Sequence, residues 1–192
     1  MFNVPEAHTL GVEAEIGFAP FEGLDIVFSG SWIEAEFDTT LPGALTQATG
    51  IREGNRLPSV PEFQFAVSGS YEWPVGTRAD GFVAASFSYV GSRFTQPADQ
   101  ENNPRTFVTG LPFGGAPASA STTIDLELPS YELLNLRAGI EFDRGLEVAA
   151  YVNNVFDENP LLSFDRERGG RARLGFQIGQ PRTYGLTVRQ SF

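Results

Sequence analysis

Apolar and polar residues alternate along most of this chain. In residues 9–18, Leu10, Val12 and Ile16 share one side, while Glu13 and Glu15 share the other. The same alternation places these apolar residues of 62–73 on one side: Phe63, Phe65, Val67, Tyr71 and Trp73. Successive side chains of a β-strand point to opposite faces, so a period of two predicts strands with one apolar and one polar face.

The alternation predicts about seven strands, separated by segments rich in turn-forming residues. These strands are expected at residues 9–18, 24–38, 62–73, 82–93, 133–142, 146–156 and 183–192. Short turns follow the first, third and fifth strands, whereas long polar segments follow the second, fourth and sixth. The long segments are expected at about 39–56, 94–130 and 157–180, and 94–130 is expected to be structureless.

This rhythm of short and long connections is typical of bacterial outer-membrane barrels. In such barrels the short turns are periplasmic and the long loops are extracellular. The pattern therefore predicts that the last strand descends and that Phe192 lies at the periplasmic rim.

Charge is distributed unequally between the two faces. The apolar faces hold no charged residue, whereas the opposite faces hold Glu13, Glu15, Asp25, Glu72, Arg137, Glu141, Glu147 and Arg189. A charge at mid-depth in lipid costs roughly 2 to 4 kcal/mol for Arg or Lys. We therefore expect an all-β fold, an antiparallel section of a transmembrane β-barrel whose polar face lines a wet lumen or contacts a plug, with structural ion pairs across strands.

A soluble sandwich or lipocalin-like barrel remains an alternative, because its strands also alternate, with the apolar face turned inward. Alternation does not separate the two folds, but the strand lengths and loop rhythm favour the membrane barrel. The mean hydropathy of -0.14 is compatible with a barrel, and no apolar run approaches the ~18 residues of a membrane-spanning helix.

Composition excludes several function classes. The net charge of -11 argues against nucleic acid as a partner, since phosphate binding requires a basic face. The absence of Cys removes disulfides, thiolate nucleophiles and Cys-based zinc sites. His8 is the only histidine, so we expect a residue near the end of a loop, no catalytic triad and no cofactor. An outer-membrane enzyme remains a further alternative.

Three segments near the C-terminus carry a family resemblance. YELLNLRAGIEF, VAAYVNNVFDENP and QPRTYGLTVRQSF resemble, in order and spacing, the closing strands of TonB-dependent receptors. NNVFDE is similar to the Asn-Leu-Phe-Asp motif of that family, and GNRLPSVPEFQFAVSGSYEW and SYVGSRF extend the resemblance upstream. The terminal Phe192 with alternating apolar residues is similar to the outer-membrane assembly signal, from which Gln190 departs.

The resemblance implies a barrel of about 22 strands closed around a plug, of which about seven strands are present here. Residues 1–192 are then a partial barrel domain without plug or N-terminal strands. The start, MFNVPEAHTLG, lacks a basic and an apolar signal region, which also predicts a fragment.

The parent protein that the resemblance implies is an active-transport receptor for an iron-siderophore or similar nutrient complex in the outer membrane of a Gram-negative bacterium. Its implied partners are outer-membrane lipid and lipopolysaccharide, the plug domain, TonB, the barrel-assembly machinery and the small-molecule nutrient complex.

One basic cluster is a candidate ligand site. It lies in a predicted extracellular loop and comprises Arg166, Arg168, Arg171 and Arg173. Forked guanidinium groups suit phosphate and carboxylate, and ferric siderophores and lipopolysaccharide are both anionic. The alternative is a solvated loop that balances nearby Asp and Glu.

Two other groups of loop residues have a structural and a functional interpretation. Oxygen ligands for Ca²⁺ are offered by Asp157, Glu158, Asn159, Asp165 and Glu167, but the spacing is not that of an EF-hand, and a solvated turn is favoured. Four loop aromatics, Phe107, Phe113, Phe164 and Phe176, either stack on a ligand or pack the loops together, and packing is favoured.

Overall fold

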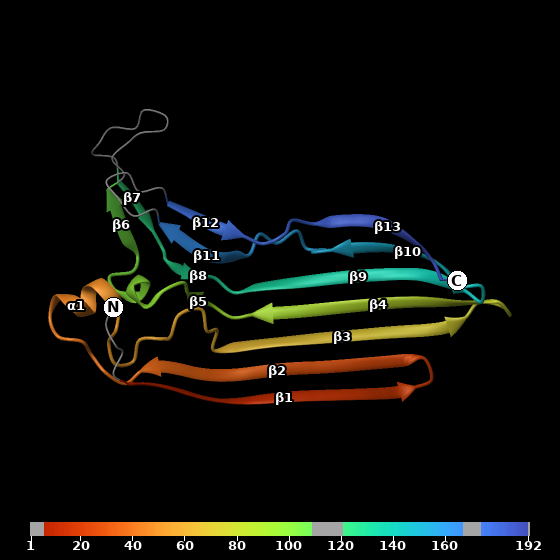
Figure 1. Ribbon diagram of the computed structural model, residues 1–192, viewed down its shortest axis with the longest axis horizontal. Helices are drawn as coiled ribbons and strands as arrows, with labels where there is room; N and C mark the ends of the chain where they lie inside the picture. The colour runs from red at the N-terminus through yellow and green to blue at the C-terminus, as the bar shows by residue number, and fades with distance from the viewer. Residues whose placement is uncertain (1–5, 109–120, 167–173, 192) are drawn as a thin grey trace.

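Seven strands form one antiparallel sheet in the computed structural model, which describes residues 6–108, 121–166 and 174–191 (Figure 1). The strand order is β1-β2-β3-β4-β9-β10-β13. The bounds are β1 Ala7–Phe21, β2 Leu24–Phe37, β3 Phe63–Pro74, β4 Ala79–Val90, β9 Tyr131–Phe142, β10 Leu146–Asn153 and β13 Thr183–Gln190. The predicted all-β sheet and its seven strands are confirmed.

The connections divide by length between the two ends of the sheet. Short turns join β1 to β2, β3 to β4 and β9 to β10, and all three lie at the right-hand end of Figure 1. The long connections lie at the opposite end, and the C-terminus lies with the short turns. The predicted alternation and the direction of the last strand are therefore present in the structure.

The register aligns apolar residues with apolar residues across the sheet. One continuous row runs across five strands and contains Ile16, Phe28, Val67, Phe87 and Leu134. The row one residue further along faces the other side and contains Gly17, Val27, Ser68, Ser86 and Asn135. Because a slip of one residue would reverse every side chain, the two-faced pattern fixes this register.

The apolar face is not packed into a core. The side chains of Ile16 on β1 and Leu186 on β13 are 57% and 79% exposed. Soluble proteins rarely expose a continuous apolar face of this extent, whereas lipid covers the face in a membrane barrel. Both large hollows of the sheet lie on the polar face instead. The lipocalin-like alternative is therefore wrong, because it requires the apolar side chains to enclose a cavity.

Aromatic residues mark the two limits of the apolar face on β3. Phe63 and Trp73 lie on the same side of this strand, ten residues apart. At about 3.3 Å per residue and a tilt of about 40°, they are separated by about 25 Å along the membrane normal, which is the height of the apolar band of outer-membrane barrels.

Two predicted strand ends are wrong, one of them for a local reason. β10 ends at Asn153 rather than near Phe156, because Asn154 has a left-handed backbone with φ 53. The fourth strand ends at Val90, and Arg93 belongs instead to the short strand β5. Left-handed backbone does not continue a ladder of hydrogen bonds.

Gln190 lies where the assembly signal has an apolar residue, and it has a structural role. Its Nε2 donates to the carbonyl oxygens of Arg144 at 2.8 Å and Ser191 at 2.7 Å. The side chain thereby ties the last residues of β13 to the turn between β9 and β10.

The long connections contain ordered elements, so the prediction of a structureless loop at 94–130 is wrong. The additional elements are α1 Ala44–Thr49, β5 Arg93–Phe94, η1 Pro97–Gln100, β6 Arg105–Val108, β7 Ser121–Ile124, β8 Glu127–Leu128, β11 Leu161–Arg166 and β12 Leu174–Ile178. No helix among the described residues is long and apolar enough to cross a membrane. Six of these elements pair within one connection, as β5 with β8, β6 with β7 and β11 with β12, while α1 with η1 and β8 with β11 make contact between connections.

Gly139 is a point where the sheet tolerates no side chain. A Cβ at this position would lie 2.5 Å from the carbonyl oxygen of Val148, 2.7 Å from the Phe82 ring and 2.8 Å from Cβ of Ala149. We expect Gly139→Ala to lower the free energy of unfolding by about 1 to 3 kcal/mol, as overpacking does. Urea titration in detergent micelles measures this change. Gly175→Ala is the control, because its Cβ would meet nothing within 4 Å, and an equal loss there would contradict the explanation.

Candidate functional site

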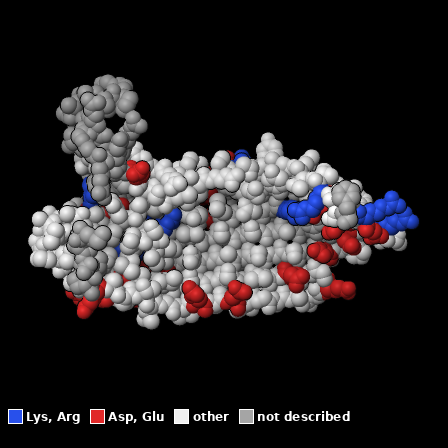
Figure 2. Space-filling model, in the orientation of Figure 1, with Lys and Arg blue, Asp and Glu red and all other residues white. Residues whose placement is uncertain are grey.

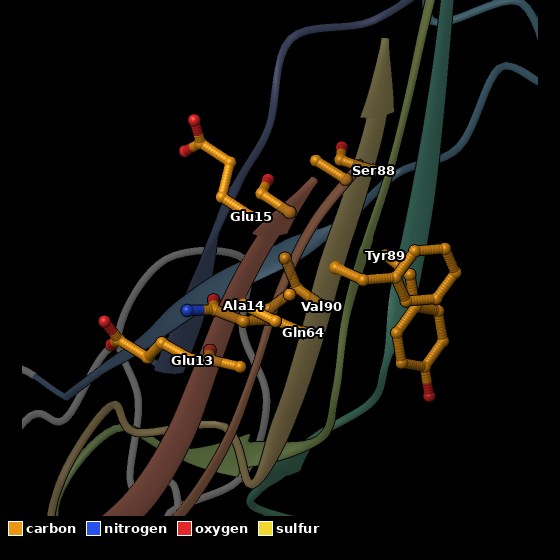
Figure 3. A pocket seen from close by; sticks show the side chains of 12 residues that line it. Glu13, Ala14, Glu15, Gln64, Ser88, Tyr89 and Val90 are labelled. Carbon is orange, nitrogen blue, oxygen red and sulfur yellow. The ribbon is translucent and has the colours of Figure 1, made fainter. Parts of the chain in front are cut away.

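The polar face of the sheet carries two adjoining hollows. The first, of about 530 Å³, is bordered by β1, β2, β3 and β4 (Figure 3). Glu13 and Glu15 project from β1 on one side of the sheet, and the ring of Tyr89 lies on the opposite side. The floor contains Ser31, whose Oγ is buried and has no hydrogen-bond partner among the described residues. Carboxylates and hydroxyls thus face one open space that apolar residues also line.

The second hollow, of about 620 Å³, continues the polar face toward β10. Hydroxyl, amide and charged groups line it: Asp25, Ser68, Ser70, Ser86, Asn135, Arg137, Tyr151 and Asn153. Such a wall offers many hydrogen-bond donors and acceptors to a polar molecule or a polar protein surface. The sequence prediction of a polar lining is confirmed for these positions.

One ion pair crosses this wall. Arg137 on β9 lies 2.5 Å from Glu147 on β10, and its guanidinium lies 5.2 Å from the centre of the Phe82 ring. Structural pairing, which the sequence analysis expected for the lumen charges, is confirmed for these two residues. Glu13 and Glu15 form no ion pair with any described residue, so their carboxylates face the first hollow unpaired.

The middle of the molecular face in Figure 2 is nearly free of charge. Acidic side chains gather along its lower edge, where β1 lies, and both acidic and basic side chains gather around the end that holds the short turns.

At the end opposite the short turns, one buried carboxylate joins two long connections. Oε1 of Glu101 accepts from Nε of Arg52 at 2.9 Å and Nδ2 of Asn55 at 3.0 Å, and its Oε2 accepts from Nη2 of Arg52 at 2.9 Å. The side chain of Glu101 is only 9% exposed. Sequence reasoning missed this group, because its members are 49 and 46 positions apart and no local motif joins them.

Further polar contacts join the same two connections. Arg56 and Gln100 form two hydrogen bonds with each other. The backbone amide of Arg56 donates to Oε1 of Gln100 at 2.9 Å, and Nε2 of Gln100 donates to the carbonyl oxygen of Arg56 at 2.8 Å. Nη2 of Arg56 also donates to the carbonyl of Ser92 at 2.7 Å, at the exit from β4.

The aromatic residues of the long connections pack together. Ring centres lie 5.8 Å apart for Phe107 and Phe164, and 5.2 Å apart for Phe164 and Phe176. Leu126, which is fully buried, completes the cluster. The predicted packing role is confirmed for these three aromatics, while Phe113 lies outside the described residues.

The Asn-Asn-Val-Phe-Asp-Glu segment forms a turn organised by Asn154. Its Nδ2 donates to the carbonyls of Glu158 at 2.8 Å and Gln180 at 3.1 Å, and its Oδ1 accepts from the Glu158 amide at 2.9 Å. Its own amide donates to Oδ1 of Asn135 on β9 at 3.0 Å. One buried side chain therefore links the exit from β10 to the entry into β13.

The predicted arginine site is described only at its first residue. Arg166 ends β11, and its side chain lies outside the description. Arg168, Arg171 and Arg173 lie outside the described residues. The assignment of an anionic ligand to this cluster stays a prediction.

The acidic turn and the single histidine have local partners. Asp157 lies in left-handed backbone, and its Oδ2 lies 3.2 Å from Nη2 of Arg182. Within the described ranges no group of three or more His, Cys, Asp and Glu is arranged to hold a metal; Glu167 lies outside them. His8 lies on β1 rather than in a loop, with Nδ1 2.6 Å from Oδ1 of Asp38.

The Glu101 contacts predict an acid sensitivity. The pKa of the Glu101 carboxyl lies below its ordinary value of 4.5, chiefly because Arg52 hydrogen-bonds the charged form, with help from Asn55 and Arg105. A carboxyl whose pKa is lowered by folding contributes stability above its ordinary pKa and loses it as the pH falls through the folded value. We expect the contact to hold at neutral pH and to weaken progressively below about 4.5.

A nitroxide label on Glu53→Cys measures this loosening in a chain that has no native cysteine. Its motion is expected to quicken as the pH falls from 7 to 3. In a second variant that also carries Glu101→Gln, the label should be mobile throughout. Label motion that follows the same pH curve in both variants would assign the transition to another group.

Comparisons with known proteins agree with this geometry. The model of a family described as TonB dependent receptor-like, beta-barrel matches residues 1–155. No curated protein sequence matches the chain.

Solved structures share the fold. The ferric yersiniabactin uptake receptor FyuA from Yersinia pestis has 20% identity and a TM-score of 0.70, over 97% of this chain and 24% of that one. The ferric preacinetobactin receptor BauA from Acinetobacter baumannii has 15% identity and a TM-score of 0.63, over 95% and 22%. The ferric citrate transporter FecA, unliganded, has 19% identity and a TM-score of 0.63, over 95% and 24%. The chain thus spans about a quarter of the length of these structures.

Proposed function

Because this chain belongs to the TonB dependent receptor-like β-barrel family of the Gram-negative outer membrane, we propose that it is a wall section of a receptor that imports a small-molecule nutrient complex. The observation that carries the proposal is the seven-stranded sheet, which is apolar on one face and hollowed and polar on the other. Such a sheet separates lipid from an aqueous lumen.

The proposed substrate class is an iron chelate such as a ferric siderophore. It rests on the names of similar structures, which are receptors or transporters for ferric yersiniabactin, ferric preacinetobactin and ferric citrate. The family comprises receptors rather than enzymes, and the proposal assigns this chain no catalytic step.

We further propose that residues 1–192 form a single partial barrel domain. The match of the family model to residues 1–155 and the position of β13 in the same sheet support a single unit. In the proposed parent receptor, a plug occupies the lumen, TonB supplies the energy coupling, and lipid and lipopolysaccharide surround the wall. The barrel-assembly machinery is the proposed partner of β13.

Transport by iron-starved cells of the source bacterium tests the function. Disrupting the coding gene is expected to reduce uptake of at least one radioactive iron chelate from a panel of citrate, catecholate and hydroxamate complexes. Restoring the gene should restore that uptake. Unchanged uptake of every chelate would contradict the proposed substrate class, and a hydrolase activity lost on His8→Ala would favour an enzyme instead.

The arginine cluster is our proposed contact for the anionic groups of the nutrient complex or of lipopolysaccharide. Replacing Arg168, Arg171 and Arg173 together by Gln is expected to raise the Kd for the imported ferric chelate about tenfold or more, since hydrogen bonds to charged groups contribute about 1.5 to 3 kcal/mol each. Equilibrium binding to receptor in micelles measures this effect. An unchanged Kd for the chelate, with weaker binding of lipopolysaccharide, would assign the cluster to the membrane surface.

A further inference from the structure

Three long connections meet at the end of the sheet opposite the short turns (Figure 1). We call the described residues of these connections the cap: 38–62, 91–108, 121–130, 154–166 and 174–182. We propose that the cap behaves as one cooperative unit, because the short segment 97–108, which contains η1, Glu101 and β6, takes part in both of the joints that hold it together.

The polar joint holds the first connection to the second. It comprises Arg52, Asn55 and Glu101, with the two-point contact between the guanidinium and the carboxylate at 2.9 Å for each hydrogen bond. Glu101 directly follows η1. Because this carboxylate is buried, loss of its partners leaves a charged group without compensation, so the joint resists partial opening.

The apolar joint holds the second connection to the third. Phe107 on β6 packs against Phe164 on β11, and Leu126 lies between the connections with no exposed surface. Two hydrogen bonds reinforce this joint: the Phe164 amide donates to Oγ1 of Thr95 at 2.7 Å, and Nη2 of Arg93 donates to the Leu161 carbonyl at 3.1 Å.

Arg105 connects the two joints within the shared segment. Its Nη2 donates to the Glu101 carbonyl at 2.8 Å and also to the Ala98 carbonyl. Arg105 is the first residue of β6, and Phe107 lies two positions beyond it. A displacement of Glu101 therefore shifts the strand that carries Phe107, which couples the polar joint to the apolar joint.

Hydrogen exchange of the chain in detergent micelles tests this coupling. Glu101→Gln is expected to raise the rate of amide exchange about tenfold or more in 50–56 and 97–105. The same increase is expected in β11 and β12, although Glu101 does not contact these strands. Phe164→Ala is expected to raise exchange in the same set of segments. Glu53→Gln and Leu162→Ala are the matched controls, because both side chains are exposed.

Independent joints would give a different pattern. Faster exchange confined to 50–56 and 97–105 in Glu101→Gln, with β11 and β12 unchanged, overturns the proposal. Protection of β3 and β4 serves as the internal measure of a folded sheet. If Glu101→Gln abolishes the protection of β3 and β4, Arg52→Gln takes its place, because it breaks the same joint at a side chain that is only half-buried. Its exchange pattern then decides between coupled and independent joints. This test does not depend on the substrate, so the proposed transport function and the cooperative cap can fail separately.

Discussion

Asn154→Ala is expected to lower the free energy of unfolding by about 2 to 4 kcal/mol, since it removes three side-chain hydrogen bonds at a buried site. The Glu158 amide and the carbonyls of Glu158 and Gln180 would lose their partner. The left-handed backbone, with φ 53, adds to the loss, because alanine is less tolerant of it than asparagine. Urea titration of the chain in micelles measures the change.

Two further variants separate the side-chain effect from the backbone effect. Asn154→Gly retains freedom at positive φ and should lose only the hydrogen bonds, so it should be less destabilised than Asn154→Ala. Asn159→Ala, at an exposed position in the same turn, is the matched control and should change stability by less than about 0.5 kcal/mol. Equal losses in Asn154→Ala and Asn159→Ala would contradict the organising role of Asn154.

Val67→Arg is expected to destabilise the membrane-inserted sheet by about 2 to 4 kcal/mol, because the side chain lies near mid-depth on the apolar face. Val67 is close to the midpoint between Phe63 and Trp73, the aromatic residues that mark the limits of the apolar band on β3. The charge would have to reach an interface across about half of the hydrocarbon layer. Refolding yield and urea titration in phospholipid vesicles measure the loss.

Ser68→Arg is the matched control, because the neighbouring side chain points to the polar face and borders the second hollow. It should be tolerated within about 0.5 kcal/mol, as solvated surface substitutions are. If Ser68→Arg were the more damaging variant in vesicles, the assignment of the lipid face would be reversed.

Strand positions were predictable because the signal is local. Alternation in 62–73 marks β3 almost to the residue, and the two faces of Glu13, Glu15 and Ile16 follow from periodicity alone. Strand ends were less predictable from the sequence. Asn154 ends β10 through its backbone conformation, although the next residues, Val155 and Phe156, are apolar like those of the strand. The amino-acid composition of this segment does not indicate such a turn.

The candidate site was predictable only in its chemistry. The polar lining followed from the face opposite the apolar residues. Ion pairs were expected among the lumen charges, but only the structure shows that Arg137 pairs with Glu147. The role of Glu101 did not follow, because its partner Arg52 is 49 positions away and neither residue belongs to a repeating pattern.

The sequence by itself determined that this chain forms two-faced strands, how many of them build the main sheet, and which end of each connects through a short turn. Each of these properties depends on neighbours within a few positions, where backbone geometry fixes the period. Only the tertiary structure decided that the long connections form a cap, because burial of Glu101 and Leu126 requires segments that are distant in the chain. Contacts of this kind gain their free energy from desolvation and packing in three dimensions, which no local pattern encodes.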